Sequence, residues 1–182
     1  MAQDDFDLDR FVDDCVAAGD DPARVHEIVA RVVRDPVPVL RVFGLPQRSF
    51  MTPLHHSPKM TILHLVWAPV MSVLPHDHRM WAVIGVYAGR EENTLWRRLR
   101  GSALERVGTA TLHAGQVQQL TRHAIHSVIN PLAQCTAAIH VYGGDFFAAE
   151  RTEWDAQGHE ERRFDIERTM QRFAAEAPSR GG

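Results

Sequence analysis

Two histidines separated by one residue, His76 and His78 in the stretch LPHDHRMW, are the side chains of this 182-residue chain best placed to do chemistry. A strand-like run follows them, and side chains two residues apart in a strand point to the same face. Two imidazoles on one face can bind one metal ion, although a useful site needs a third ligand from another element. The alternative is that both are ordinary hydrogen-bonded strand residues.

The elements that must position these histidines change in type along the chain. Apolar residues recur at three- and four-residue spacing in two N-terminal stretches, which predicts helices. Asp21 is a candidate N-cap with Pro22 at the first helical position, and Pro36 and Pro38 are expected to end the second helix. From about Met60, short strand-like runs alternate with glycine, asparagine and proline, which predicts a β-sandwich or barrel.

We therefore expect one domain of mainly β structure in three parts. An N-terminal helical segment, residues 1–45, packs on a barrel formed by residues 46–160. Residues 161–182 form a C-terminal helix and tail, and the last six residues, APSRGG, are expected to fray.

Charge and composition exclude several classes of partner. The formal net charge is −3, so we expect neither nucleic acid nor an anionic membrane surface as a partner. The acidic N-terminus lacks the features of a signal peptide, and no apolar run approaches the roughly 20 residues that span a bilayer. The two cysteines, Cys15 and Cys135, are expected to be buried thiols, which favours a cytoplasmic location.

The stretch AGQVQQLTRHAIHSVIN resembles the second sequence motif of the cupin superfamily, and LPHDHRMW resembles part of the first. The residues at matching separations are Gly115, His126 and Asn130 in the second motif and His76, His78 and Gly89 in the first. The resemblance implies a cupin double-stranded β-helix, a jelly-roll barrel, with His126 as the third metal ligand. Ala82 or Val83 replaces the glutamate that most cupins use as a fourth ligand.

From about Ser49 to Trp154 the chain looks like the thiol dioxygenases, the cupins that hold iron with three histidines and no glutamate. The stretches that carry this resemblance are HDHRMWAVIGVYAG and IHVYGGD. They are similar to the bacterial branch that acts on 3-mercaptopropionate and related thiols. The resemblance implies that His76, His78 and His126 bind Fe(II), although another divalent metal such as Zn, Ni or Mn could occupy the site in purified protein.

The same resemblance implies roles for three further residues. Tyr142 directs its hydroxyl toward the substrate and O₂ and is oriented by His140, which alternation places on the same strand face. Arg151 stands where the bacterial branch has the arginine that binds the substrate carboxylate. The family's serine two residues before the relay histidine is replaced by Ala138, so the usual Ser-His-Tyr relay is incomplete.

The sequence thus predicts an iron-dependent thiol dioxygenase that converts a small thiol carboxylate, similar to 3-mercaptopropionate or cysteine, to a sulfinic acid with O₂. Two alternatives stay open. One is a cupin metalloenzyme of another class, such as an isomerase, a ring-cleaving dioxygenase or a hydrolase. The other is a non-catalytic cupin that binds a small molecule. The N-terminal helices could cover the barrel or a second subunit, which leaves a homodimer open.

Overall fold

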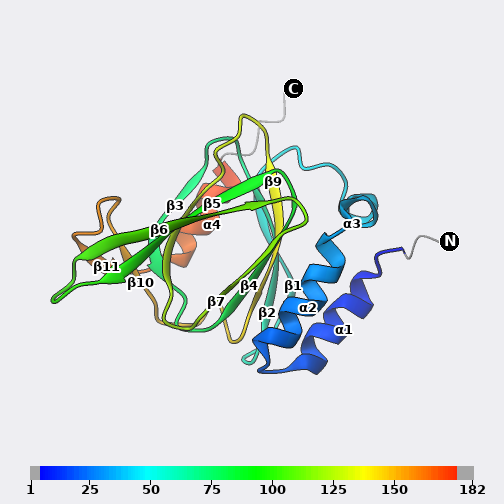
Figure 1. Ribbon diagram of the computed structural model, residues 1–182, viewed down its shortest axis with the longest axis horizontal. Coiled ribbons are helices and arrows are strands. Elements are labelled where there is room, and N and C mark those ends of the chain that lie inside the picture. The colour runs from blue at the N-terminus through cyan, green and yellow to red at the C-terminus, as the bar shows by residue number, and fades with distance from the viewer. Residues whose placement is uncertain (1–4, 176–182) are drawn as a thin grey trace.

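Two antiparallel β-sheets face each other in the computed structural model, which describes residues 5–175 (Figure 1). Within that range the helices are α1 (Leu8–Ala18), α2 (Pro22–Val33), α3 (Pro36–Phe43) and α4 (Ile166–Ala175). The strands are β1 (Phe50–His56), β2 (Thr61–Trp67), β3 (Ser72–Asp77), β4 (Ala82–Ala88), β5 (Arg90–Arg98), β6 (Leu104–His113), β7 (Val117–Leu120), β8 (Ile125–Ile129), β9 (Thr136–Tyr142), β10 (Thr152–Trp154) and β11 (Glu161–Arg163).

The strand order identifies the architecture. One sheet has the order β1-β2-β9-β4-β7 and the other has the order β11-β10-β3-β8-β5-β6. The chain crosses from one sheet to the other between β2 and β3, between β3 and β4, between β4 and β5, and again at each connection from β6 to β9. This is the eight-stranded jelly roll of the cupin double-stranded β-helix, with β1, β10 and β11 extending the two sheets.

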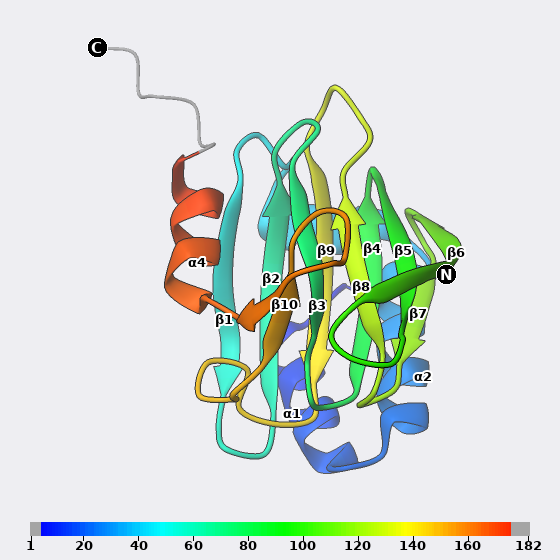
Figure 2. The same cartoon turned by 90° about the vertical axis from the view of Figure 1, so that its left-hand side faces the viewer.

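The two central strands β2 and β9 are buried along their whole length because both faces are covered. Leu63, Leu65 and Tyr142 face the interior between the sheets, whereas Ile62 and Ile139 belong to a second core beneath the N-terminal helices. Figure 2 shows α1 and α2 lying behind the sheet that contains β2, β9 and β4. This double coverage explains why both strands read as nearly continuous apolar runs.

The N-terminal helices confirm one expectation and correct another. The Asp21 side chain accepts backbone hydrogen bonds at the start of α2, with Pro22 at the first helical position. Pro36 and Pro38, expected to end that helix, lie in the first turn of α3, where Asp35 is the N-cap. Proline suits the first turn because its missing N–H has no helical acceptor there.

The C-terminal segment begins as β11 at residues 161–163 and only then forms α4. Arg168 of α4 pairs with the buried carboxylate of Glu153 on β10, and Phe173 of α4 packs against the Trp67 ring. The expected frayed end lies outside the described residues.

Among the helices of residues 5–175, none is long and apolar enough to cross a membrane. Cys15 is buried as expected, whereas Cys135 is only half-buried.

Candidate metal centre

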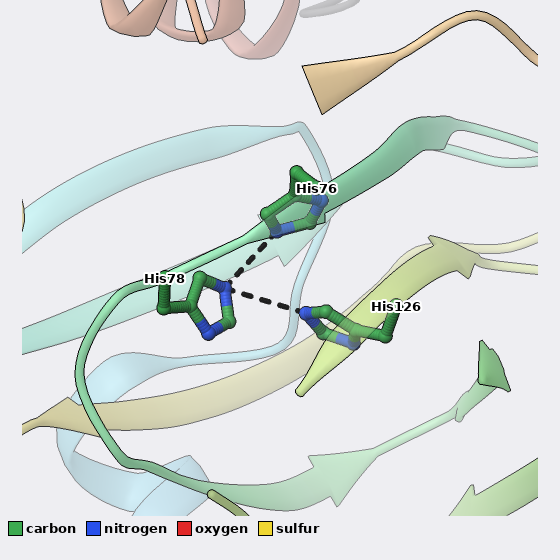
Figure 3. A group of neighbouring side chains, drawn as sticks. All are labelled: His76, His78 and His126. Atoms are coloured by element: carbon green, nitrogen blue, oxygen red, sulfur yellow. Dashed lines mark hydrogen bonds between the residues drawn. The ribbon is translucent and has the colours of Figure 1, made fainter. Parts of the chain in front are cut away.

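The side chains of His76, His78 and His126 converge inside the barrel (Figure 3). His76 lies on β3, His78 directly follows that strand, and His126 lies on the neighbouring strand β8 in register with His76. The Nε2 atom of His78 is 3.0 Å from Nε2 of His76 and 3.3 Å from Nε2 of His126. Two imidazole nitrogens bound to one ion at about 2.0–2.1 Å would lie roughly 2.9–3.4 Å apart, so this spacing suits a shared metal.

Hydrogen bonds on the far side of two rings direct their Nε2 lone pairs inward. The Nδ1–H of His76 donates to the Leu74 carbonyl at 2.8 Å, and the Nδ1–H of His126 donates to Asn93 Oδ1 at 2.8 Å. The Nε2 atoms of both rings are then acceptors. A single proton on His78 Nε2 could satisfy only one of them, whereas one cation satisfies all three nitrogens. The donor set therefore fits a divalent metal ion.

Burial keeps these three histidines in the neutral form that binds metals. Desolvation lowers the pKa of His76 to about 4, against the opposing effect of its hydrogen bond to the backbone. Burial, together with the neighbouring histidines, also places the pKa values of His78 and His126 well below the usual value. All three are available as ligands at neutral pH.

The group contains no acidic ligand. Across the described range, the histidine, cysteine and acidic side chains grouped closely enough to share an ion are these three histidines alone. Ala82, at one of the two positions expected for a motif glutamate, faces the same interior, and Val83 faces the core under the helices. Three neutral ligands leave the full charge of a divalent ion uncompensated, which favours binding of an anionic ligand at an open position.

Tyr142 and His140 lie side by side next to the three histidines. The Tyr142 ring packs edge-on against His78 with their ring centroids 5.1 Å apart, and its hydroxyl is 3.0 Å from His140 Nδ1. Burial raises the pKa of Tyr142, an effect that the charge of Arg151 opposes and the charge of Glu91 reinforces. Both side chains are therefore where the sequence predicts them, on one strand face and beside the candidate ligands.

Two polar residues that sequence reasoning missed hold the site from β5. Asn93 supports His126, and Glu91, which has no exposed surface, accepts a hydrogen bond from Trp67 Nε1 at 2.7 Å and lies 3.4 Å from His140 Nε2. They occur in the charged run REENTLW, which suggests a solvated strand edge. The available signal is alternation, since Glu91 and Asn93 are two residues apart and share the inward face.

Arg151 is buried with most of its hydrogen-bonding capacity unused. Its guanidinium lies 4.1 Å from the centres of both the Phe146 and Phe164 rings, and Nη2 donates to the Phe146 carbonyl at 2.9 Å. Its Nε and Nη1 atoms have no partner among residues 5–175. Burial lowers the pKa of Arg151 to about 10, partly offset by Tyr142 and Asp77. A buried guanidinium with free donors is suited to a carboxylate ligand.

The three histidines line a cavity of about 30 Å³, which has room for one or two water molecules. Its other walls are Tyr142, His140 and a set of apolar side chains that includes Trp67, Phe146, Phe164 and Phe173. Phe164 and Phe173 come from the C-terminal segment, so this segment closes one side of the cavity. Any ligand larger than water requires these apolar side chains to shift.

No known family model matches the chain. Among solved structures it is similar to an uncharacterized conserved protein with a double-stranded β-helix domain from Klebsiella pneumoniae, with 12% identity over 63% of this chain and 87% of the other, at a TM-score of 0.48. It is also similar to a cupin superfamily protein from Desulfitobacterium hafniense, with 14% identity over 60% and 90% of the two chains and a TM-score of 0.47. An oxalate oxidase matches with 17% identity over 56% of this chain and 53% of its own, at a TM-score of 0.43. These scores are low, and the strand order itself defines the fold. The chain has the cupin double-stranded β-helix fold and carries three histidines that could hold a metal ion.

Proposed function

We propose that this protein is a non-haem iron thiol dioxygenase that converts a small thiol carboxylate to the corresponding sulfinic acid. The observation that carries the proposal is a three-histidine group without an acidic ligand, beside a buried tyrosine. A buried arginine with free donors, Arg151, does not line the cavity itself but packs on Phe146 and Phe164 of its wall. This combination offers a place for a soft anionic sulfur, a hydroxyl next to it and a cation for a carboxylate.

His76, His78 and His126 would hold Fe(II), which when bound would favour a thiolate ligand and supply the one-electron chemistry that O₂ requires. The three imidazoles hold the ion without adding negative charge. The outer nitrogens of His76 and His126 are anchored by a backbone carbonyl and by Asn93, so these two ring planes are fixed before the ligand arrives.

Arg151 binds the substrate carboxylate in this proposal. Nε and Nη1 are its free donors, and either of them can donate to a carboxylate oxygen, while the flanking Phe146 and Phe164 rings keep the guanidinium plane in place. Anchoring the carboxylate fixes the sulfur at one position near the histidines, which increases the rate by proximity. The shift of apolar side chains that admits the substrate would also remove water from this space.

The overall reaction is balanced without a further reductant. One thiol and one O₂ give one sulfinic acid, the S–H bond breaks, and both oxygen atoms end on sulfur. Tyr142 contacts the bound ligand through its hydroxyl, and the barrel interior excludes solvent around it. Asp77, which accepts from Arg79 and from the Thr152 amide, has a structural role in joining β3 to β10.

Aerobic turnover of the iron-loaded protein tests the proposal. We expect O₂ consumption with 3-mercaptopropionate or cysteine, with one O₂ used per thiol and a product heavier by two oxygen atoms in mass spectrometry. With labelled O₂, both labels should appear in the product. Iron-loaded protein that consumes no O₂ with a panel of small thiols would contradict this function and favour another cupin reaction or a binding role.

A further inference from the structure

The carboxylate of Glu91 lies behind His140, on the side away from Tyr142. It has no exposed surface and belongs to β5 in one sheet, whereas His140 and Tyr142 belong to β9 in the other. A buried carboxylate is costly unless it is hydrogen-bonded, and Glu91 Oε2 has no partner within the described part of the chain. The reason for burying this carboxylate must therefore lie in the contacts of its other oxygen, Oε1.

Glu91 Oε1 determines which nitrogen of His140 carries the proton. Oε1 accepts a hydrogen bond from Trp67 Nε1–H at 2.7 Å, so Oε1 is an acceptor atom whether or not the other oxygen, Oε2, carries a proton. His140 Nε2, 3.4 Å away, must then be the N–H donor in this contact. In the neutral imidazole Nδ1 is left as an acceptor, and it accepts a hydrogen bond from the Tyr142 hydroxyl group over 3.0 Å.

We propose that Glu91 is a positioning residue for Tyr142 that acts through His140. It holds His140 in the Nε2–H form and thereby turns the Tyr142 O–H toward Nδ1, so that Tyr142 presents its oxygen lone pairs to the cavity. Tyr142 is then an acceptor for a donor group on the ligand. Glu91 takes the outer place of the relay that Ala138 cannot fill, because an alanine side chain has no hydrogen-bonding group.

This inference relies on the proposed function only for its activity measurement, since the histidine tautomer can be observed without turnover. In ¹⁵N-histidine-labelled protein loaded with diamagnetic Zn(II), long-range ¹H–¹⁵N spectra distinguish protonated from unprotonated ring nitrogens. The His140 signals are assigned by their loss in His140→Asn. We expect a protonated Nε2 and an unprotonated Nδ1 in the unmodified protein. The reverse pattern would overturn the proposal.

Three variants separate positioning from support of the fold. Glu91→Gln keeps an acceptor oxygen and should keep the tautomer, whereas Glu91→Leu should give a mixture of both forms. Trp67→Phe removes the other donor to Oε1 and should leave the tautomer unchanged. An unchanged tautomer in folded Glu91→Leu protein would overturn the proposal. If that variant does not fold, an Nδ1–H form of His140 in the Glu91→Gln protein serves as the overturning result.

The activity measurement asks whether Glu91 acts through Tyr142. We expect Glu91→Leu to lower kcat about 10–100-fold, in the range seen when the hydrogen-bond partner of a functional histidine is lost, and Glu91→Gln to lower it less. In a Tyr142→Phe background the Glu91 changes should have no further effect. The same fold-loss in both backgrounds would show that Glu91 acts elsewhere. Absence of thiol oxidation in every variant would contradict the proposed function and leave the tautomer result to decide this inference.

Discussion

Replacement of Arg151 by methionine tests how the substrate carboxylate is recognised. Methionine keeps an unbranched side chain between the Phe146 and Phe164 rings but removes the guanidinium donors. Two substrates are compared, 3-mercaptopropionate and its uncharged amide, which differ in the group that Arg151 would bind. We expect the variant to discriminate against the carboxylate and to treat the amide almost as the unmodified protein does.

The magnitude follows from the two donor atoms, Nε and Nη1, that have no partner among the described residues. A hydrogen bond to a charged group contributes about 1.5–3 kcal/mol, and the variant loses one such bond to the carboxylate. That corresponds to a fall of roughly 10–100-fold in kcat/KM for 3-mercaptopropionate. Because the carboxylate lies away from the sulfur, most of the fall should appear in KM. The amide should lose less than about fivefold, since it carries no negative charge for the guanidinium to bind.

The assay is O₂ uptake by iron-loaded protein over a range of thiol concentrations. Arg163→Met is the matched control, because Arg163 is an exposed arginine on β11 whose carboxylate partner, Glu150, is also exposed. The control should leave both substrates unchanged. Equal losses for carboxylate and amide in the Arg151 variant would refute the reasoning, because they would indicate general damage to the site.

Three further predictions concern metal affinity, acid stability and packing. Asn93→Ala should weaken Zn(II) or Fe(II) binding about 10–100-fold, measured by competition with a chelator, because His126 loses the partner that fixes its ring. Unchanged metal affinity would show that Asn93 does not orient His126 for metal binding. Metal-free protein should lose up to about 3 kcal/mol of unfolding free energy for each of His64 and His76 as the pH falls from 6.5 to 4, measured by denaturant titration. Burial lowers the pKa of both to about 4, so in this range the unfolded chain takes up protons that the folded chain does not. An unfolding free energy that does not change with pH would contradict this. Gly85→Ala should destabilise the fold by about 1–3 kcal/mol with metal affinity unchanged, because the added Cβ would lie 2.4 Å from a valine methyl of α2. A calorimetric unfolding scan that matches the unmodified protein would show that α2 does not pack against β4 as described.

The residues that sequence reasoning located are those whose positions follow from local periodicity. The i, i+2 spacing within His76–His78 and within His140–Tyr142 is enough to predict shared strand faces, and both pairs converge in the barrel. The short strands and their turn residues likewise predict a β-sandwich or barrel, and the strand order confirms the jelly roll that the resemblance to cupins implies.

What escaped sequence reasoning depends on contacts between distant elements. Glu91 meets His140 across 49 positions of the chain, and alternation pairs it with Asn93 on one strand face without indicating that this face is the buried one. The need for glycine at position 143 also comes from a contact between distant elements. A Cβ there would lie about 2 Å from the Trp81 ring, so the tryptophan of one motif and the glycine of another are packed together. The proline pair at the start of α3 was ambiguous for a different reason, since proline is compatible with the region after one helix and with the first turn of the next.

The most direct test of the account is X-ray absorption spectroscopy of the protein loaded with one equivalent of Fe(II) under anaerobic conditions, read together with the same experiment on His126→Ala. We predict three histidine nitrogens at about 2.0–2.2 Å, no protein carboxylate ligand, and loss of one nitrogen in the variant. Failure to retain one iron per chain, or an iron environment that His126→Ala leaves unaltered, would contradict the assignment of His76, His78 and His126 as the metal site.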